Sequence, residues 1–499
     1  MNYIDLIVFF VCTGGIVLMG SLFYKKGTKA SEFTNAGGSI PGWVVGMSIF
    51  STYVSSISYL GNPGKAYEGD WNPFVFGLSI PIACWISARW FVPFYRRHAS
   101  VSAYAFLEER FGLWARIYAS SCYLLTQIAR MGSILFLLAM PMNILMGWNL
   151  STVIVITSIA IIFYSMLGGM KAVIWTEAVQ GFLLIGGALV CLGVLLFTMP
   201  EGPSQAFRLA IDAEGGNKFS LGSFSLSDWA SSTFWVCLIY GVFTNLQNYG
   251  IDQNYVQRYH TAKSDSEARH AALFGGWLYI PVSAMFFLIG TCLYSYYQAC
   301  PDPHITADGM LTMGSDGAVV SKPDYVFPYF MITSLPKGLT GLLIASVFAA
   351  GMSTVATSVT SCSTIIYTDY YERARKEATE RESLWVLKLS SLGVGILGIV
   401  VALALVNVDS ILDTWWKLSS IFSGGMLGLF LLGFLSRRVR NIHAILGVIC
   451  GFAIIAWISA YEWLGLPNPG LHSYLAIVLG TTTIFFVGFF VSLIFCRKS

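Results

Sequence analysis

Small hydroxyl side chains recur within a stretch whose hydropathy suits a membrane-spanning helix. In FSTYVSSISYLGNP (50–63), Ser51, Ser55 and Ser58 stand at i, i+4 and i+7, which places three hydroxyls on one face of a helix. Such hydroxyls commonly hold helices together in bilayers, at about 0.6 kcal/mol per hydrogen bond. They can also replace the hydration shell of a hard cation, together with the carbonyls of an unwound helix.

A second stretch, FAAGMSTVATSVTSCST (348–364), repeats this pattern more strongly. Its small and hydroxyl residues follow i, i+3, i+4, i+7, i+11 and i+14, so the spacing predicts one polar face along the helix. The residues on that face are Ala350, Ser353, Thr354, Thr357, Ser361 and Thr364.

Arg130 and Glu177 are charged residues that fall inside apolar segments. Arg130 lies in LLTQIARMGSILFLL, where a buried charge costs roughly 2.5 to 3.5 kcal/mol on the insertion scale. Its guanidinium can hold a carboxylate through two parallel hydrogen bonds, so the partner is either an anionic substrate or a protein acid. Glu177, in AVIWTEAVQGF, is the internal candidate for that pairing, or else a cation ligand.

The composition places these residues in a membrane. The 499 residues are 56% hydrophobic and 11% charged, with a mean hydropathy of +0.67, which is far from that of a soluble globular chain. Taking roughly 20 apolar residues per span predicts about thirteen transmembrane helices in an all-α polytopic protein. The predicted spans are 3–23, 41–62, 73–95, 117–146, 150–167, 173–198, 230–250, 271–296, 340–366, 386–406, 412–435, 442–464 and 472–495.

The distribution of basic residues predicts the topology. Most Lys and Arg residues, Arg258 among them, fall in loops on one side, which the positive-inside rule makes cytoplasmic. The other side keeps only Lys65, Arg208, Lys218, Lys322 and Lys337. We therefore expect a multi-pass protein of the cytoplasmic membrane with its N-terminus outside and its C-terminus inside. The first apolar segment lacks a basic n-region and a cleavage site, so we expect it to be retained.

The sequence lacks the motifs that are typical of several classes of function. The cysteines form no CxxC pair, the histidines show no ligand spacing, and no glycine-rich stretch has the GxxxxGK pattern of a phosphate loop. These patterns argue against an enzyme and against ATP-driven transport, and they leave an ion gradient as the energy source. The sequence indicates a lipid bilayer around the chain, no nucleic acid partner and no obligatory protein partner.

Two spans are interrupted at corresponding places. One is 41–62, and the other is GVFTNLQNYGIDQNYVQRY (241–259), which carries Asn245, Gln247 and Asn248 at membrane depth. Paired interruptions are typical of inverted-repeat transporters, whose substrate site lies at the bilayer midplane. We expect an extra N-terminal helix and loop, a first repeat, a second repeat and two C-terminal helices, at 1–40, 41–200, 201–440 and 441–499.

Three motifs resemble the sodium:solute symporter family over nearly the whole chain. They are YSMLGGMKAVIWTE (164–177), DQNYVQRY (252–259) and FAAGMSTVATS (348–358). The resemblance implies a leucine-transporter-like fold with two inverted five-helix repeats. It also implies Na+ as the coupling ion, bound by main-chain or hydroxyl oxygens of Ser51, Val54, Ala350, Ser353 and Thr354.

Within the family, GWVVGMSIFSTYVSSISYLGNPGKAY, SAYAFLEERF and QIARMGSILFLL are similar to bacterial sialic acid symporters. The resemblance implies that Arg130 binds a substrate carboxylate and that Ser55 and Ser58 line the pocket. Asn245 and Gln247, from the interrupted second span, are further candidate contacts. Tyr53 and Gly77 depart from the pattern, because those symporters carry a small hydroxyl residue and a glutamine there.

A second sodium site, present in some of these symporters, would use Glu177 and Thr357. Ala356 lacks the other expected hydroxyl, so the sequence favours a single coupled ion. We therefore expect a sodium-driven symporter that imports a small organic acid, with sialic acid as the leading candidate. Uptake of a neutral sugar or a short monocarboxylate is the alternative, and a membrane sensor or channel-like protein lies outside this class.

Overall fold

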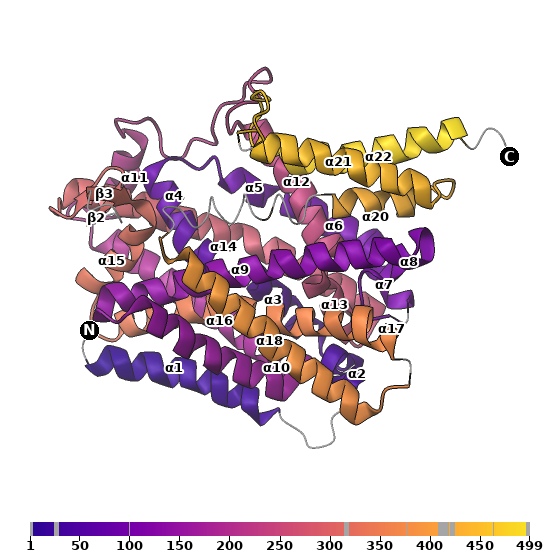
Figure 1. The fold of residues 1–499 in the computed structure, drawn as a ribbon. Coiled ribbons are helices and arrows are strands. Elements are labelled where there is room, and N and C mark those ends of the chain that lie inside the picture. Colours follow the sequence, from indigo (N-terminus) through magenta and orange to yellow (C-terminus); the bar gives the residue numbers. More distant parts are fainter. Residues whose placement is uncertain are drawn as a thin grey trace.

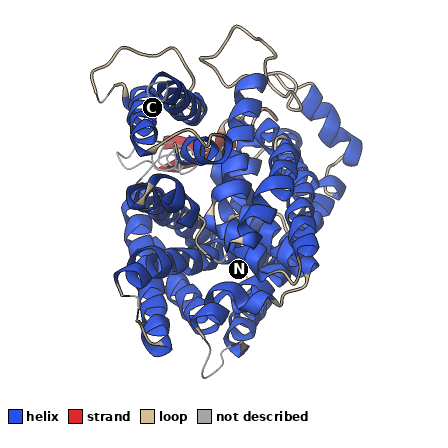
Figure 2. Cartoon of the chain, turned by 90° about the vertical axis from the view of Figure 1, so that its right-hand side faces the viewer, coloured by secondary structure: helices blue, strands red, loops and turns tan. Residues whose placement is uncertain are grey.

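The computed structural model describes residues 3–23, 29–98, 100–313, 319–375, 377–407, 419, 425–462 and 464–495. Figure 1 shows a bundle of helices whose long axes run in similar directions, and Figure 2 views many of them end-on. The start of α1 and the end of α22 lie at opposite ends of this bundle. The predicted all-α class is confirmed.

The bounds of the elements show how the chain is divided. The first half contains α1 (Tyr3–Leu22), α2 (Ala30–Asn35), η1 (Ala36–Gly38), α3 (Gly42–Tyr53), η2 (Ile57–Gly61), α4 (Asn62–Glu68), α5 (Phe74–Leu78), α6 (Ile80–Ile86), η3 (Ser87–Phe91), α7 (Val92–Arg97), α8 (Ala105–Phe111), α9 (Leu113–Met146), α10 (Leu150–Phe197) and α11 (Pro203–Ile211). The second half contains α12 (Phe234–Ile251), α13 (Gln253–Thr261), α14 (Asp265–Ala299), η4 (Pro323–Tyr325), α15 (Val326–Thr333), α16 (Leu339–Ile365), η5 (Ile366–Tyr371), α17 (Glu372–Ala374), α18 (Glu380–Ala404), η6 (Leu405–Asn407), α20 (Met426–Leu435), α21 (Asn441–Ala460) and α22 (Leu475–Phe495).

The number of spans differs from the expectation of about thirteen. Among the described residues, nine helices are long and apolar enough to cross a membrane, or ten when one bent pair counts as a span. The predicted spans 150–167 and 173–198 lie on either side of Gly169, whose non-helical backbone (φ 57°, ψ −156°) divides α10 into two helices, as the prediction had it. A residue with a side chain rarely adopts that conformation. The predicted span 412–435 lies partly outside the described residues.

A small sheet was not predicted. Strands β1 (Ile305–Thr306), β2 (Gly309–Met313) and β3 (Val319–Lys322) form an antiparallel sheet between α14 and α15. It lies at the end of the bundle where α1 begins (Figure 1). The sheet contains few residues, so periodicity in a loop of this length carries little signal for it.

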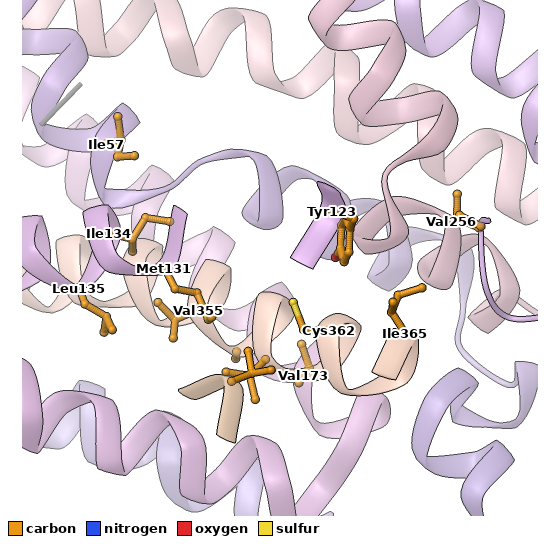
Figure 3. Close-up of a cluster of buried hydrophobic side chains, with 14 of the residues drawn as sticks. Ile57, Tyr123, Met131, Ile134, Leu135, Val173, Val256, Val355, Cys362 and Ile365 are labelled. Atoms are coloured by element: carbon orange, nitrogen blue, oxygen red, sulfur yellow. The ribbon is translucent and has the colours of Figure 1, made fainter. Parts of the chain in front are cut away.

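Helix α16 forms the centre of the bundle and is buried along nearly its whole length. The apolar side chains of α16, which lie on faces other than its polar one, pack against α9 and α10. Figure 3 shows part of this core, with Met131, Ile134 and Leu135 of α9 near Val355 of α16. The apolar packing holds the polar face of α16 in one orientation, toward the interrupted helices.

Both interrupted spans are broken in the structure. The axes of Gly42–Tyr53 and Ile57–Glu68 differ by 60°, and the break falls at Val54 and Ser55. The second break falls at Asp252, whose extended backbone separates α12 from α13. Because Ser51 precedes the first break and Ser58 follows it, the expectation of one continuous hydroxyl face is wrong. A helical periodicity cannot extend through residues that are not helical.

Candidate functional site

The end of α3 releases backbone carbonyls at the centre of the protein. The last carbonyls of a helix have no partner within that helix, so other groups must satisfy them. The carbonyl of Ser51 accepts a hydrogen bond from the Ser353 hydroxyl of α16 at 3.0 Å. The next carbonyl, that of Thr52, accepts one from Nη2 of Arg130 at 3.2 Å. Neighbouring residues of one helix end thus face two different parts of the site.

The five predicted sodium ligands lie at this junction. Ser353 Oγ is 2.9 Å from the Ala350 carbonyl, and Thr354 Oγ1 is 3.2 Å from the same oxygen. Val54, the residue at the break, is fully buried beside Ser51. Neutral oxygens from two elements, one of them an interrupted helix, form a donor set that suits a hard monovalent cation. The arrangement is compatible with a sodium site.

A cavity of about 140 Å³ adjoins the break in this helix. Arg130 is half-buried in its wall, and Ser55, Ser58, Tyr53 and Gly77 line it as well. Further lining residues come from elements far apart in the sequence: Ile57, Asn62, Lys65, Pro73, Phe76, Cys237, Tyr240, Thr244, Asn248, Tyr255, Tyr279, Ser283, Phe287, Ser419 and Tyr474. The cavity therefore combines two cationic side chains, Arg130 and Lys65, with many hydroxyl and aromatic groups, as expected for a site that binds a polar organic anion.

Asn245 and Gln247 do not line this cavity, in contrast to the prediction. The amide of Asn245 instead accepts a hydrogen bond from the Tyr53 hydroxyl and donates one to Ser79 Oγ at 2.8 Å. The cavity-lining residues of α12 are Thr244 and Asn248. These two are four residues apart and therefore lie on one face of α12.

Glu177 forms an ion pair with Arg258, not with Arg130. Both of its carboxylate oxygens lie 2.7 Å from Nη2 of Arg258, and both side chains are fully buried. The carboxylate also accepts hydrogen bonds from Ser48 and Thr357. The hypothesis that Glu177 is the internal partner of Arg130 is therefore wrong.

Arg258 is the main site residue that the sequence analysis missed. The distribution of basic residues predicts it in a cytoplasmic loop, although it belongs to the motif DQNYVQRY. The guanidinium donates to Ser48 Oγ at 2.8 Å, to Thr357 Oγ1 at 2.6 Å and to the carbonyl of Asn254. The two proposed ligands of a second sodium, Glu177 and Thr357, are thus already bound by a cationic side chain.

Gln127 of α9 hydrogen-bonds to residues of two other segments, and the sequence analysis missed it as well. One turn before Arg130, Gln127 donates to Asp252 Oδ2 at 3.2 Å and accepts from Ser358 Oγ of α16 at 2.8 Å. Asp252, at the second helix break, interacts electrostatically with Arg130. The i, i+3 spacing of Gln127 and Arg130 was the available signal for a shared helix face.

Comparisons with known proteins support the same interpretation. The model of the sodium:solute symporter family matches residues 33–451. The chain is 33% identical to the sodium/sialic acid symporter SiaT of Proteus mirabilis, over 92% of this chain and 90% of that protein. It is 30% identical to the sodium/sialic acid symporter NanT of Aliivibrio fischeri, over 98% and 92%. A solved structure of a Na+-coupled sialic acid symporter, substrate-bound and outward-open, matches with a TM-score of 0.86 and 28% identity over 99% and 98%.

Proposed function

The chain belongs to the sodium:solute symporter family, and on that premise we propose that it imports a small organic acid together with sodium, with sialic acid as the leading substrate. The similar symporters whose names include sialic acid support this substrate, as does the position of Arg130 in the cavity. We place the protein in the cytoplasmic membrane, with its N-terminus outside and its C-terminus inside.

One observation carries the proposal. The carbonyl of Ser51 accepts a hydrogen bond from Ser353, on the sodium side. The adjacent carbonyl of Thr52 accepts one from Arg130, on the substrate side. A sodium ion that orders the end of α3 against α16 therefore also sets the position of Arg130. By linkage, a substrate that orders Arg130 must raise the affinity for sodium by the same factor.

In this mechanism, oxygens of Ser51, Val54, Ala350, Ser353 and Thr354 replace the hydration shell of sodium. Arg130 then holds the substrate carboxylate by charge-assisted hydrogen bonds, and Ser55 and Ser58 bind its polar groups. Rocking of one helix bundle against the other carries both solutes across the membrane.

Uptake into proteoliposomes tests the proposed function. We expect an inward sodium gradient to drive accumulation of radiolabelled N-acetylneuraminate, and an equal potassium gradient to leave it at the passive level. Labelled lactate and labelled galactose serve as comparison substrates. Accumulation of lactate or galactose alone would exclude sialic acid and support one of the alternatives. No sodium-dependent uptake of any of the three would contradict the proposed function.

Loss of a sodium oxygen should weaken sodium binding. We expect Ser353→Ala and Thr354→Ala each to raise the sodium concentration for half-maximal uptake about tenfold, the equivalent of one hydrogen bond of roughly 1 to 1.5 kcal/mol. Ser363→Ala is the matched control, because its buried hydroxyl binds the Thr360 carbonyl within α16. Equal sodium dependence of wild type, both variants and the control would remove these residues from the site.

We expect one sodium ion per substrate, because Arg258 already supplies the positive charge beside Glu177 and Thr357. One sodium ion and one monovalent acid carry no net charge together. A potential imposed with valinomycin should therefore leave sodium-driven uptake of N-acetylneuraminate unchanged. Stimulation by an inside-negative potential, or a reversal potential that gives two sodium ions, would refute the single-ion stoichiometry.

A further inference from the structure

The cavity wall at Gly77 is completed by a residue of another helix. A Cβ atom at Gly77 would lie 3.3 Å from Cε1 of Tyr279 and 3.6 Å from Oγ of Ser283. Both of these residues belong to α14 and line the cavity. The ring of Tyr279 therefore occupies the space into which a long side chain at position 77 would extend.

Tyr279 forms an aromatic corner with Tyr53. The two rings meet edge to face with centroids 4.5 Å apart, an arrangement that aromatic pairs favour. The Tyr53 ring is held in place by the hydrogen bond from its hydroxyl to Asn245. It also makes a stacked contact with Tyr249, with the ring centroids 6.0 Å apart. The corner is thus a rigid apolar surface within a cavity that is otherwise rich in polar groups.

The hydroxyl of Ser283, beside this corner, lacks a regular hydrogen-bond partner among the described residues. Ser283 is 1% exposed, and its Oγ makes no hydrogen bond of ordinary length and angle with the described residues. The phenol of Tyr279 lies within hydrogen-bonding reach of it, as of Ser58 and Asn62. Native structures satisfy nearly all buried polar groups, so a cavity-wall hydroxyl without a regular hydrogen bond indicates a place where a ligand completes the bonding.

We propose that Tyr279 and Ser283 determine the substrate specificity of this cavity. Together with Tyr53 they select a ring-shaped hydroxy acid. Its carboxylate faces Arg130, the C–H face of its saturated ring packs on the aromatic corner, and one of its hydroxyls bonds to Ser283. This proposal rests on the proposed function and specifies its substrate class. A short acid would reach only Arg130 and would leave Ser283 unpaired, which is how a hydrogen-bonding site rejects an analogue.

A double-mutant cycle tests the role of Tyr279. We expect Gly77→Gln to reduce the affinity of the sodium-loaded, detergent-solubilised protein for N-acetylneuraminate by more than about tenfold, because the new side chain meets the ring. Tyr279→Ala alone should also weaken binding, by removing the aromatic corner. Gly77→Gln combined with Tyr279→Ala should bind more tightly than Gly77→Gln alone. If the losses of binding free energy in the two single variants simply add in the double variant, the assignment of Tyr279 is overturned.

Ser283→Ala tests the hydroxyl contact. We expect it to weaken binding of N-acetylneuraminate about tenfold, the loss of one hydrogen bond, with the melting temperature unchanged. Unchanged affinity would overturn the assignment of Ser283. Wild type that binds glucuronate but not N-acetylneuraminate would refute sialic acid as the substrate and leave the ring-acid class supported. Wild type that binds lactate alone would overturn the ring-acid class while sodium-coupled acid transport stands.

Discussion

Arg258→Met is expected to destabilise the protein by about 3 to 5 kcal/mol, the cost of leaving one member of a buried ion pair without its partner. The Glu177 carboxylate would remain fully buried, and only hydroxyls, those of Ser48, Thr52 and Thr357, would still bind it among the described residues. We expect a large drop in the yield of monodisperse protein and in the melting temperature of the remainder. Fluorescence-detected size-exclusion chromatography and a thermal melt measure both.

Two further variants distinguish a lost ion pair from a general packing defect. Arg258→Met combined with Glu177→Met removes both charges and should recover part of the stability, because no unpaired charge remains. Lys263→Gln changes an exposed cation shortly after α13 and should have little effect. A double variant no more stable than Arg258→Met would contradict the importance of the pair.

Arg130→Lys is expected to weaken substrate binding by about 1.5 to 3 kcal/mol, or roughly ten- to more than a hundredfold. An ammonium is a point charge and cannot form the two parallel hydrogen bonds that a guanidinium makes with a carboxylate. Arg130 also binds the Thr52 carbonyl at the end of α3, so its loss should reduce the coupling to sodium. Calorimetric titration of N-acetylneuraminate at low and at saturating sodium measures both effects.

The carboxyl-reduced analogue of sialic acid is the control ligand for Arg130. It keeps the ring and hydroxyls and lacks the charge, so wild type should bind it far more weakly than the acid. Arg130→Lys should then discriminate little between the two. Equal binding of both ligands by wild type would exclude carboxylate recognition and support the neutral-sugar alternative.

Local chemistry made several features predictable. Long apolar runs indicated a helical membrane protein, and the dense hydroxyl, Gly and Pro content of 50–63 indicated an interrupted helix. The hydroxyl spacing around Ser353 indicated the polar face of α16. Arg130 could be singled out because a cation within an apolar run needs a partner. Each of these inferences depends on residues close together in the chain, where periodicity and transfer costs apply directly.

Pairings across the bundle were decided by the tertiary structure alone. Glu177 pairs with Arg258, 81 positions away, because the breaks in two helices and the packing of α16 bring α10 and α13 together. Likewise, Tyr279 fills the space beside Gly77 only because α14 packs against α5 there. The sequence by itself determined that the chain is a helical membrane protein and which two spans are interrupted. Which charges neutralise each other, and which side chains shape the cavity, depended on long-range packing that no local pattern encodes.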